Sequence, residues 1–203
     1  ITANGGTGNT SGGGGAIAID SINAGGMVVS NLQAYGGAGS RPGSAGSVHV
    51  KSTGATFGNL TIDNTGRGQG TTELPSLGIG TAQAGSSGAT LVTDRATDVP
   101  AYFEGHWIDV AGKGIWRIAT INGKSVTLAP NANESIAIAP GDAWRGVYRF
   151  DTLRIRNSIV TSGDRIEFTT LDKDAGSTLF VNAGAPVLDA AKIAVVSTTT
   201  TQD

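Results

Sequence analysis

Two glycine-rich stretches decide the fold: ITANGGTGNTSGGGGAIAID at residues 1–20 and LQAYGGAGSRPGSAGSVHVK at residues 32–51. When the second stretch is laid on the first with a shift of 31 residues and no gap, each of its five glycines falls on a glycine of the first. Composition alone would not place these glycines in phase, so the alignment predicts one structural unit written twice. Apolar residues coincide as well: Ile1 with Leu32, Ala3 with Ala34, Ile17 with Val48 and Ile19 with Val50.

A repeat of about 20 to 50 residues is typical of solenoids, whose units bury a common core by stacking on their neighbours. Ile or Val alternates with a small or polar residue at residues 16–19 and 47–51, which is the period of a β-strand. Glycine suits the turns between such strands because it accepts positive φ and lets neighbouring backbones approach. We therefore predict an all-β protein, a glycine-rich β-helix or β-solenoid, with its first rungs at residues 1–64.

A second pair of similar segments predicts where the solenoid resumes. FGNLTIDN at residues 57–64 and FDTLRIRN at residues 150–157 share the pattern F-x-x-L-x-I-x-N. Both read as strands with Leu and Ile inward and a final Asn that bonds the backbone of its own turn. The sequence between them does not follow the 31-residue repeat. We expect a glycine-rich connection at residues 65–101, an inserted module at residues 102–149, and returning rungs with a polar tail at residues 150–203.

The inserted module is predicted to be a small antiparallel β-barrel-like unit. Asn122-Gly123 is a strong hairpin signal, because a type I′ turn needs positive φ at both central positions. Residues 65–89, by contrast, are polar and glycine-rich and are expected to form a long loop or irregular coil. Strands are expected within the module near residues 106–110, 115–121, 125–129 and 145–150, and in the returning rungs near residues 165–169, 178–181 and 192–196.

All three tryptophans of the chain lie in this module. We expect Trp107, Trp116 and Trp144 to fill its core. The alternative is that one or two of them are exposed and stack on sugar rings, whose C–H faces suit an aromatic surface. In that case the module binds carbohydrate or acts on polysaccharide, and a surface polysaccharide is its partner.

Composition argues against several function classes. With 14 Lys and Arg against 16 Asp and Glu, the net charge is −2, so no basic face for nucleic acid or an anionic membrane is expected. No stretch approaches the roughly 20 apolar residues of a membrane-spanning helix. The absence of cysteine excludes disulfides. His49 and His106 have no second His or Cys at metal-ligand spacing, which argues against a transition-metal site, and we expect His49 to be a solvated surface residue.

The segment LDKDAGS places Asp172 and Asp174 in the pattern D-x-D-x-G, which resembles half of a calcium loop. A further acidic position and the closing Glu are missing, so a solvated turn is the favoured interpretation and a weak calcium site the alternative. No other cofactor is predicted. Carboxylates near Arg would form a glycosidase-like or lyase-like site only if they converged; the candidates are Asp63 with Arg67, and Asp151, Arg154, Arg156 and Asp164. Outward charges on strands usually form weak ion pairs, and we predict no enzymatic activity.

The G-G-x-G motif, the glycine run before A-I-A-I, GSVHVK and FGNLTIDN together resemble the glycine-rich repeats of very large bacterial surface and adhesin-like proteins. GDAWRGVYRFDTLRI is similar to segments that accompany those repeats. The resemblance implies a secreted or surface-exposed β-solenoid with a structural or adhesive role. Its partners would be copies of itself or flanking repeats of the same chain, assembled as a fibre or sheath. Abundant threonine suggests an ice-binding solenoid as a further alternative, but regular T-x-T rows are absent.

Overall fold

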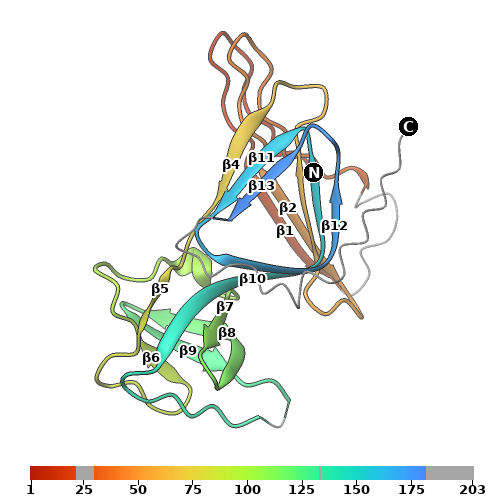
Figure 1. Ribbon diagram of the computed structural model, residues 1–203. Coiled ribbons are helices and arrows are strands. Elements are labelled where there is room, and N and C mark those ends of the chain that lie inside the picture. The colour runs from red at the N-terminus through yellow and green to blue at the C-terminus, as the bar shows by residue number, and fades with distance from the viewer. Residues whose placement is uncertain (22–29, 133, 182–203) are drawn as a thin grey trace.

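The computed structural model describes residues 1–21, 30–132 and 134–181. These residues form thirteen strands and one short 3₁₀ helix, so the all-β prediction is confirmed (Figure 1). The strand expected at residues 192–196 lies outside the described residues. In chain order the elements are β1 (Ala16–Ser21), β2 (Ser47–Ser52), β3 (Asn59–Asp63), β4 (Gly70–Leu74), β5 (Ile79–Thr81), β6 (Thr90–Val92), η1 (Ala101–Phe103), β7 (Trp107–Val110), β8 (Gly114–Asn122), β9 (Ser125–Ala129), β10 (Ala143–Arg156), β11 (Ser158–Ser162), β12 (Arg165–Lys173) and β13 (Thr178–Val181).

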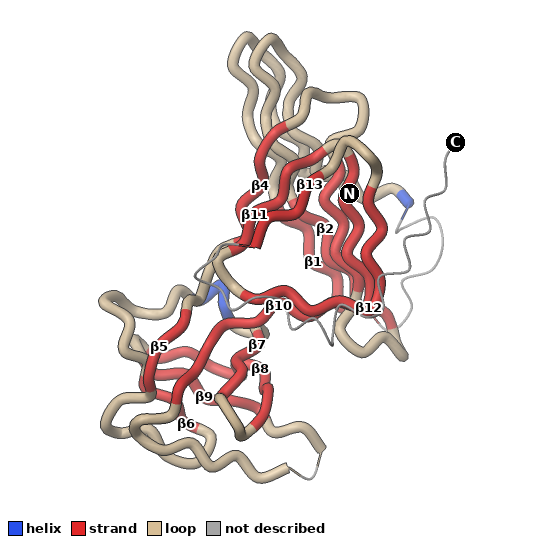
Figure 2. Tube along the Cα trace, in the orientation of Figure 1, coloured by secondary structure: helices blue, strands red, loops and turns tan. Residues whose placement is uncertain are grey.

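Strands β1 and β2 pair in parallel, with Ile17 opposite Val48 and Ile19 opposite Val50. Two isolated parallel bridges, Thr2 with Gln33 and Thr10 with Arg41, join residues that are also 31 positions apart. The two glycine-rich stretches are therefore adjacent layers, in the register that the alignment predicted. Their loops run side by side and project together from one end of the molecule (Figure 2).

Strands β3 and β10 also pair in parallel, and this pairing brings the chain back beside the first layers. Leu60 lies opposite Leu153 and Ile62 opposite Ile155, and all four side chains are buried, as the shared pattern predicted. Strand β12 pairs in parallel on the other side of β10. A second sheet, with the order β13-β11-β4, faces these strands across a core, as Figure 1 shows. The core consists of Ala45, Leu60, Ile62, Leu74, Phe150, Leu153, Ile155, Val160 and Ile166.

The expectation of an irregular loop at residues 65–89 is wrong, because β4 and β5 lie there. In β4 the residues alternate between exposed and more buried positions and end on Leu74, which joins the core. Threonine and glutamate occupy the outward positions, which is why the segment looked like polar coil. Strand β4 pairs in parallel with β11 from Ser158–Gly70 to Ser162–Leu74.

The inserted module is antiparallel, with β10, β7, β8, β9 and β6 in that order and β5 on the other side of β10. Its predicted strands are present, but the sheet does not close into a barrel: no pairing joins β5 to β6 among the described residues. Both end strands are only three residues long, and each is already paired on its inner edge. The module core includes Leu77, Leu91, Phe103, Ile108, Trp116, Val126, Leu128 and Trp144.

The hairpin expected at Asn122-Gly123 joins β8 to β9, one residue further along than predicted. Asn122 is itself the last strand residue and pairs with Ser125, so the two-residue turn is Gly123-Lys124. Gly123 has φ of 60°, whereas Asn122 is not among the residues with positive φ. A glycine at the first central position is what a type II′ turn requires.

Candidate functional site

The two stacked glycine-rich loops form the first candidate surface. We call residues 4–15 the outer loop and residues 35–46 the inner loop. Each loop doubles back through the same internal hydrogen bond, from Gly12 N–H to Gly6 O in one and from Gly43 N–H to Gly37 O in the other, both 3.0 Å. None of their glycines has positive φ. The expected role of glycine in positive-φ turns is therefore wrong here, and close backbone approach is its role.

The inner loop touches the outer loop backbone to backbone. A Cβ atom added to any of four inner-loop glycines would lie less than 3.0 Å from an outer-loop carbonyl oxygen, a separation that real Cβ atoms essentially never show. On its other side the inner loop meets residues 64–70, where a Cβ on Gly70 would collide with the Ser44 backbone. Only glycine permits this stacking distance. The four inner-to-outer pairs are Gly37 with Gly6, Gly39 with Gly8, Gly43 with Gly12 and Gly46 with Gly15.

Three outer-loop glycines, Gly6, Gly8 and Gly12, lack this steric need, whereas a Cβ on Gly5 would collide with Gly12 O of its own loop. A Cβ on Gly6 would meet nothing within 4 Å, and one on Gly8 or Gly12 would meet only atoms of its own loop, at 3.5 and 3.4 Å. Among the described residues nothing packs on this outward side. The outer loop therefore presents an uncovered backbone face. Its glycines have the same spacing as those of the inner loop, which the outer loop covers.

A buried asparagine, Asn64, holds the inner loop through side-chain hydrogen bonds to its backbone. The Oδ1 atom of Asn64 accepts the Gly36 N–H at 2.8 Å, and its Nδ2 donates to Gly43 O at 2.9 Å and Gly68 O at 2.7 Å. Asn64 is fully buried. The expectation that this Asn bonds its own turn is correct only for the Gly68 contact. The two other bonds reach residues at least 21 positions away, which no local pattern indicates.

A cavity of about 640 Å³ between β1–β2 and the η1–β7 segment forms the second candidate surface. We call it the aromatic groove. Strands β1 and β2 supply small and polar side chains to one wall, including Ala18, His49 and Lys51. The remaining lining is rich in rings, from Phe57, Tyr102, Phe103, Trp107, Tyr148 and Phe150.

Ring contacts cross the floor of the aromatic groove. Tyr148 meets His106 edge-on at 4.5 Å and stacks on Phe150 at 5.9 Å, measured between ring centroids. The Tyr148 hydroxyl donates to Pro75 O at 2.6 Å. Burial, with the nearby Asp164 carboxylate, raises the pKa of Tyr148, so this phenol stays neutral and structural.

Of the three tryptophans, only Trp107 lines the aromatic groove. It meets Phe57 edge-on at 5.5 Å, and the Arg149 guanidinium lies 4.1 Å from the Phe57 ring centroid and 5.0 Å from that of Trp107. Trp116 and Trp144 are 3% and 2% exposed and pack in the module core. Neither has a ring face open to a sugar.

The carboxylates considered for calcium are bound by protein donors. Asp172 pairs with Arg156 at 2.5 Å and Arg154 at 2.8 Å. Burial opposes ionisation, but these bonds hold the pKa of Asp172 below its usual value. Asp174 accepts the Asn157 N–H at 2.9 Å and the Ser177 hydroxyl at 2.6 Å. In the part of the chain that the structure describes, no three His, Asp or Glu side chains gather as metal ligands.

Two other side chains singled out from the sequence also have hydrogen-bond partners within the protein. Asp151, considered for catalysis, accepts the N–H groups of Phe57 and Gly58 at 3.1 and 3.0 Å. The expectation that His49 is a solvated surface residue is wrong: it is only partly exposed, and its Nε2 lies 3.1 Å from Phe57 O. Its strand neighbours Val48 and Val50 face the opposite side, so its outward side is the aromatic groove.

Asp164, considered for catalysis from the sequence, is a buried carboxylate in the turn between β11 and β12, and sequence reasoning missed the partners that it holds. It accepts the Ser76 hydroxyl at 2.6 Å and the Leu77 and Gly78 N–H groups at 2.7 and 2.8 Å, and lies 3.1 Å from His106 Nε2. Burial raises its pKa, but these hydrogen bonds outweigh burial and hold the pKa below the usual value. Ser76 and His106 bond the carboxylate rather than each other, so the cluster is structural and not a nucleophilic triad.

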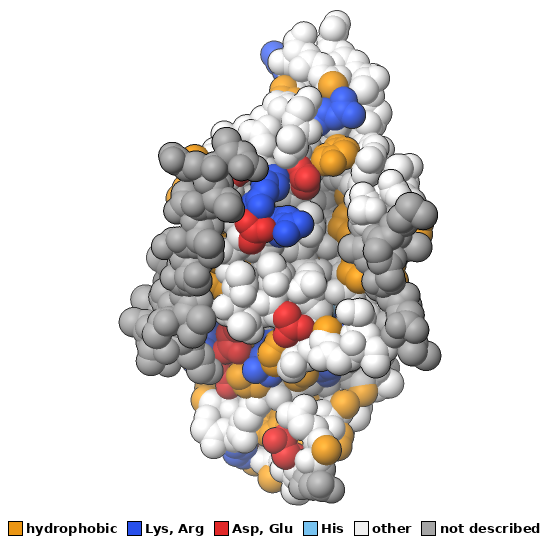
Figure 3. Space-filling model, turned by 90° about the vertical axis from the view of Figure 1, so that its right-hand side faces the viewer, with side chains coloured by type: hydrophobic (Ala, Val, Ile, Leu, Met, Phe, Trp, Pro, Cys, Tyr) orange, Lys and Arg blue, Asp and Glu red, His pale blue; other side chains and the backbone are white. Residues whose placement is uncertain are grey.

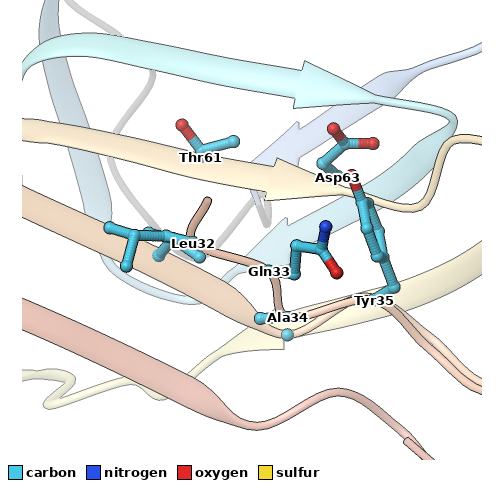
Figure 4. A pocket seen from close by; sticks show the side chains of 8 residues that line it. Leu32, Gln33, Ala34, Tyr35, Thr61 and Asp63 are labelled. Carbon is cyan, nitrogen blue, oxygen red and sulfur yellow. The ribbon is translucent and has the colours of Figure 1, made fainter. Parts of the chain in front are cut away.

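A small cavity of about 30 Å³ lies beside the inner loop, lined by residues that include Leu32, Thr61 and Asp63 (Figure 4). Tyr35 lies at its rim, and burial and the nearby Asp63 carboxylate raise the pKa of this phenol, although Arg67 opposes them. The cavity has room for about one water molecule and not for a larger ligand.

The face in Figure 3 carries acidic and basic side chains intermixed, without a continuous patch of one sign. No helix of the described residues is both long and apolar enough to cross a membrane. Comparison of the chain with protein-family models, with curated proteins and with solved structures finds no match.

Proposed function

We propose that this chain is a non-enzymatic structural segment of an exported bacterial surface protein, a glycine-rich β-solenoid that extends by stacking further layers on its outer loop. The observation that carries the proposal is the outer-loop backbone face. Gly6, Gly8 and Gly12 repeat the spacing of glycines that need close contact one layer inward, yet have no such contact in the described residues.

Two further observations support it. The parallel register of 31 residues runs from the Thr2–Gln33 bridge to the end of β1 and β2, so a whole layer repeats. Strand β1 pairs only with β2 among the described strands, which leaves its other edge available for a strand of another copy. Copies of the same chain, or flanking repeats, supply the complementary glycine-rich layer, and a fibre or sheath is the expected product.

Analytical ultracentrifugation over a range of concentrations tests the proposal. We expect reversible self-association that is lost in the Gly6→Leu/Gly8→Leu variant, because its side chains project where the next layer must lie. The β-sheet circular dichroism should be unchanged. Ser40→Leu, at the exposed tip of the inner loop, is the matched control and should associate like the unsubstituted chain. A chain that remains monomeric throughout, or association that survives the double substitution, contradicts end-on stacking.

Location is tested separately. Fractionation of the native source into cells, surface extract and medium, with an antibody to this chain, should give a surface-bound signal. A signal confined to the cell interior contradicts export.

A further inference from the structure

The aromatic groove holds side chains whose binding groups are not used by the protein. Tyr102 is 68% exposed, and its ring packs against Phe103 at 4.8 Å between centroids. Among the described residues, no hydrogen bond or ion pair engages the Tyr102 hydroxyl, the Lys51 ammonium or the Glu104 carboxylate. An open ring face and unpaired polar groups thus line the same cavity.

The size of the aromatic groove suits a ligand rather than a solvent pocket. Its volume of about 640 Å³ lies within the range of about 300 to 1,000 Å³ that is usual for small-molecule sites. Its lining is mainly apolar with a few polar groups, the composition that gives such sites both affinity and orientation.

The polar groups decide the class of ligand. Lys51 and Arg117 offer donors, whereas Asp20 and Glu104 offer carboxylate acceptors. A ligand that satisfies both must donate and accept hydrogen bonds and also present an apolar face to aromatic rings. Sugar rings meet all three conditions, because each hydroxyl both donates and accepts and the C–H faces stack on aromatic side chains.

We propose that the aromatic groove binds a neutral oligosaccharide, with Tyr102 and Trp107 against sugar-ring faces and Glu104 accepting from sugar hydroxyls. This activity does not depend on end-on stacking, since every lining residue belongs to one chain.

Other ligand classes fit less well. A proline-rich peptide suits aromatic grooves, but proline has no N–H to donate and would leave the carboxylates of Asp20 and Glu104 unpaired. Single-stranded nucleic acid stacks on aromatic rings but needs a positively charged groove. The three cationic side chains, from Lys51, Arg117 and Arg149, stand against those two carboxylates in the same lining.

Titration of the full chain with neutral hexasaccharides tests the proposal. The probes are cellohexaose, maltohexaose, xylohexaose and chitohexaose, followed by calorimetry and by acrylamide quenching of tryptophan fluorescence. Because Trp116 and Trp144 are buried, quenching reports mainly on Trp107. We expect at least one probe to bind and to protect Trp107 from the quencher.

Two variants and a control assign the binding to the aromatic groove. Tyr102→Ala and Glu104→Gln should each raise the dissociation constant about tenfold, because each removes one stacking or hydrogen-bonding contact. Phe180→Ala removes another exposed ring, 56% exposed on β13 and outside the groove, and should leave binding unchanged. Tyr102 and Glu104 are exposed, so circular dichroism should show folded variants.

The proposal is overturned if no hexasaccharide binds at millimolar concentration, if binding is insensitive to both groove substitutions, or if Phe180→Ala weakens it equally. Binding of a proline decapeptide or an oligothymidylate in place of every saccharide would also reject it, in favour of the other ligand class. The stacking proposal and the saccharide proposal can be refuted separately. The Gly6→Leu/Gly8→Leu variant should be a monomer and should still bind the saccharide.

Discussion

Alanine substitutions at equivalent glycines of the two loops measure what close stacking contributes. Gly12 and Gly43 lie at the same position in successive layers, 31 residues apart. A Cβ on Gly43 would lie less than 3.0 Å from Gly12 O, whereas a Cβ on Gly12 would meet no atom nearer than Gly6 N, at 3.4 Å. The chemical change is identical, so any difference between Gly43→Ala and Gly12→Ala reports on the contact between layers.

The magnitude follows from that contact. The layers must separate by about 1.5 Å to restore an ordinary carbon–oxygen distance. Such overpacking costs typically about 1 to 3 kcal/mol. The separation also weakens the bonds from Gly37 N–H to Gly12 O and from Gly14 N–H to Ser44 O, both 2.9 Å, each with a net contribution of about 1 kcal/mol. We expect Gly43→Ala to lose about 3 kcal/mol. Gly12→Ala should gain up to about 1 kcal/mol, because alanine lowers the entropy of the unfolded chain.

Urea unfolding at low protein concentration, followed by far-ultraviolet circular dichroism, measures both values without interference from association. Hydrogen exchange of the Gly37 and Gly14 amides should accelerate in Gly43→Ala and remain unchanged in Gly12→Ala. Equal destabilisation by the two substitutions would refute the reasoning, since only one of them faces a covered layer. Full tolerance of Gly43→Ala would refute it equally.

Three further outcomes are expected. Asn64→Ala leaves the buried Gly36 N–H and Gly43 carbonyl without their partner, so urea unfolding should show a loss of about 3 kcal/mol, whereas Asn59→Ala at the exposed start of β3 should change stability by less than about 1 kcal/mol. The folded-state pKa of Asp164 lies below its unfolded value of 3.8, so its contribution to stability is complete above pH 3.8 and is lost as the pH falls through the folded pKa. The free energy of unfolding should therefore fall more steeply with decreasing pH in the unsubstituted chain than in Asp164→Asn. Equal pH dependence in the two proteins would contradict the assignment. Calcium at millimolar concentration, or its removal by chelator, should leave the melting temperature unchanged because two arginines already pair with Asp172, and a calcium-dependent rise would show that a site exists.

The layer register could be predicted because the residues that contact each other between the layers are all separated by the same 31 positions in the sequence. A glycine in the inner loop is required by the carbonyl it approaches in the outer loop, so the requirement appears as glycines in phase. The inward Leu and Ile of β3 and β10 could be predicted for a similar reason, since adjacent parallel strands share one core. Their separation of 93 residues is three times 31, but the two strands are immediate neighbours, so the multiple does not count layers.

The aromatic groove and the Asp164 cluster could not be predicted, because each joins segments with no pattern in common. His106 and Asp164 are 58 positions apart, and Ser76 and Asp164 are 88 apart. Periodicity shows which residues of a strand share a face, but not which side is covered by the rest of the molecule. The three tryptophans illustrate this limit, since Trp116 and Trp144 face the module core while Trp107 lines the aromatic groove.

Strand β1 connects the two proposals. Its side chains at Ala16, Ala18 and Asp20 form one wall of the aromatic groove, while its backbone is the edge that end-on stacking would extend. Parallel layers in register place equivalent side chains beside each other, as Ala18 lies beside His49. A further layer on β1 would therefore lengthen the groove wall by one strand. Stacking would enlarge the surface open to a polysaccharide without changing the residues of any single chain, so a polymer would be held by several layers at once and with higher avidity.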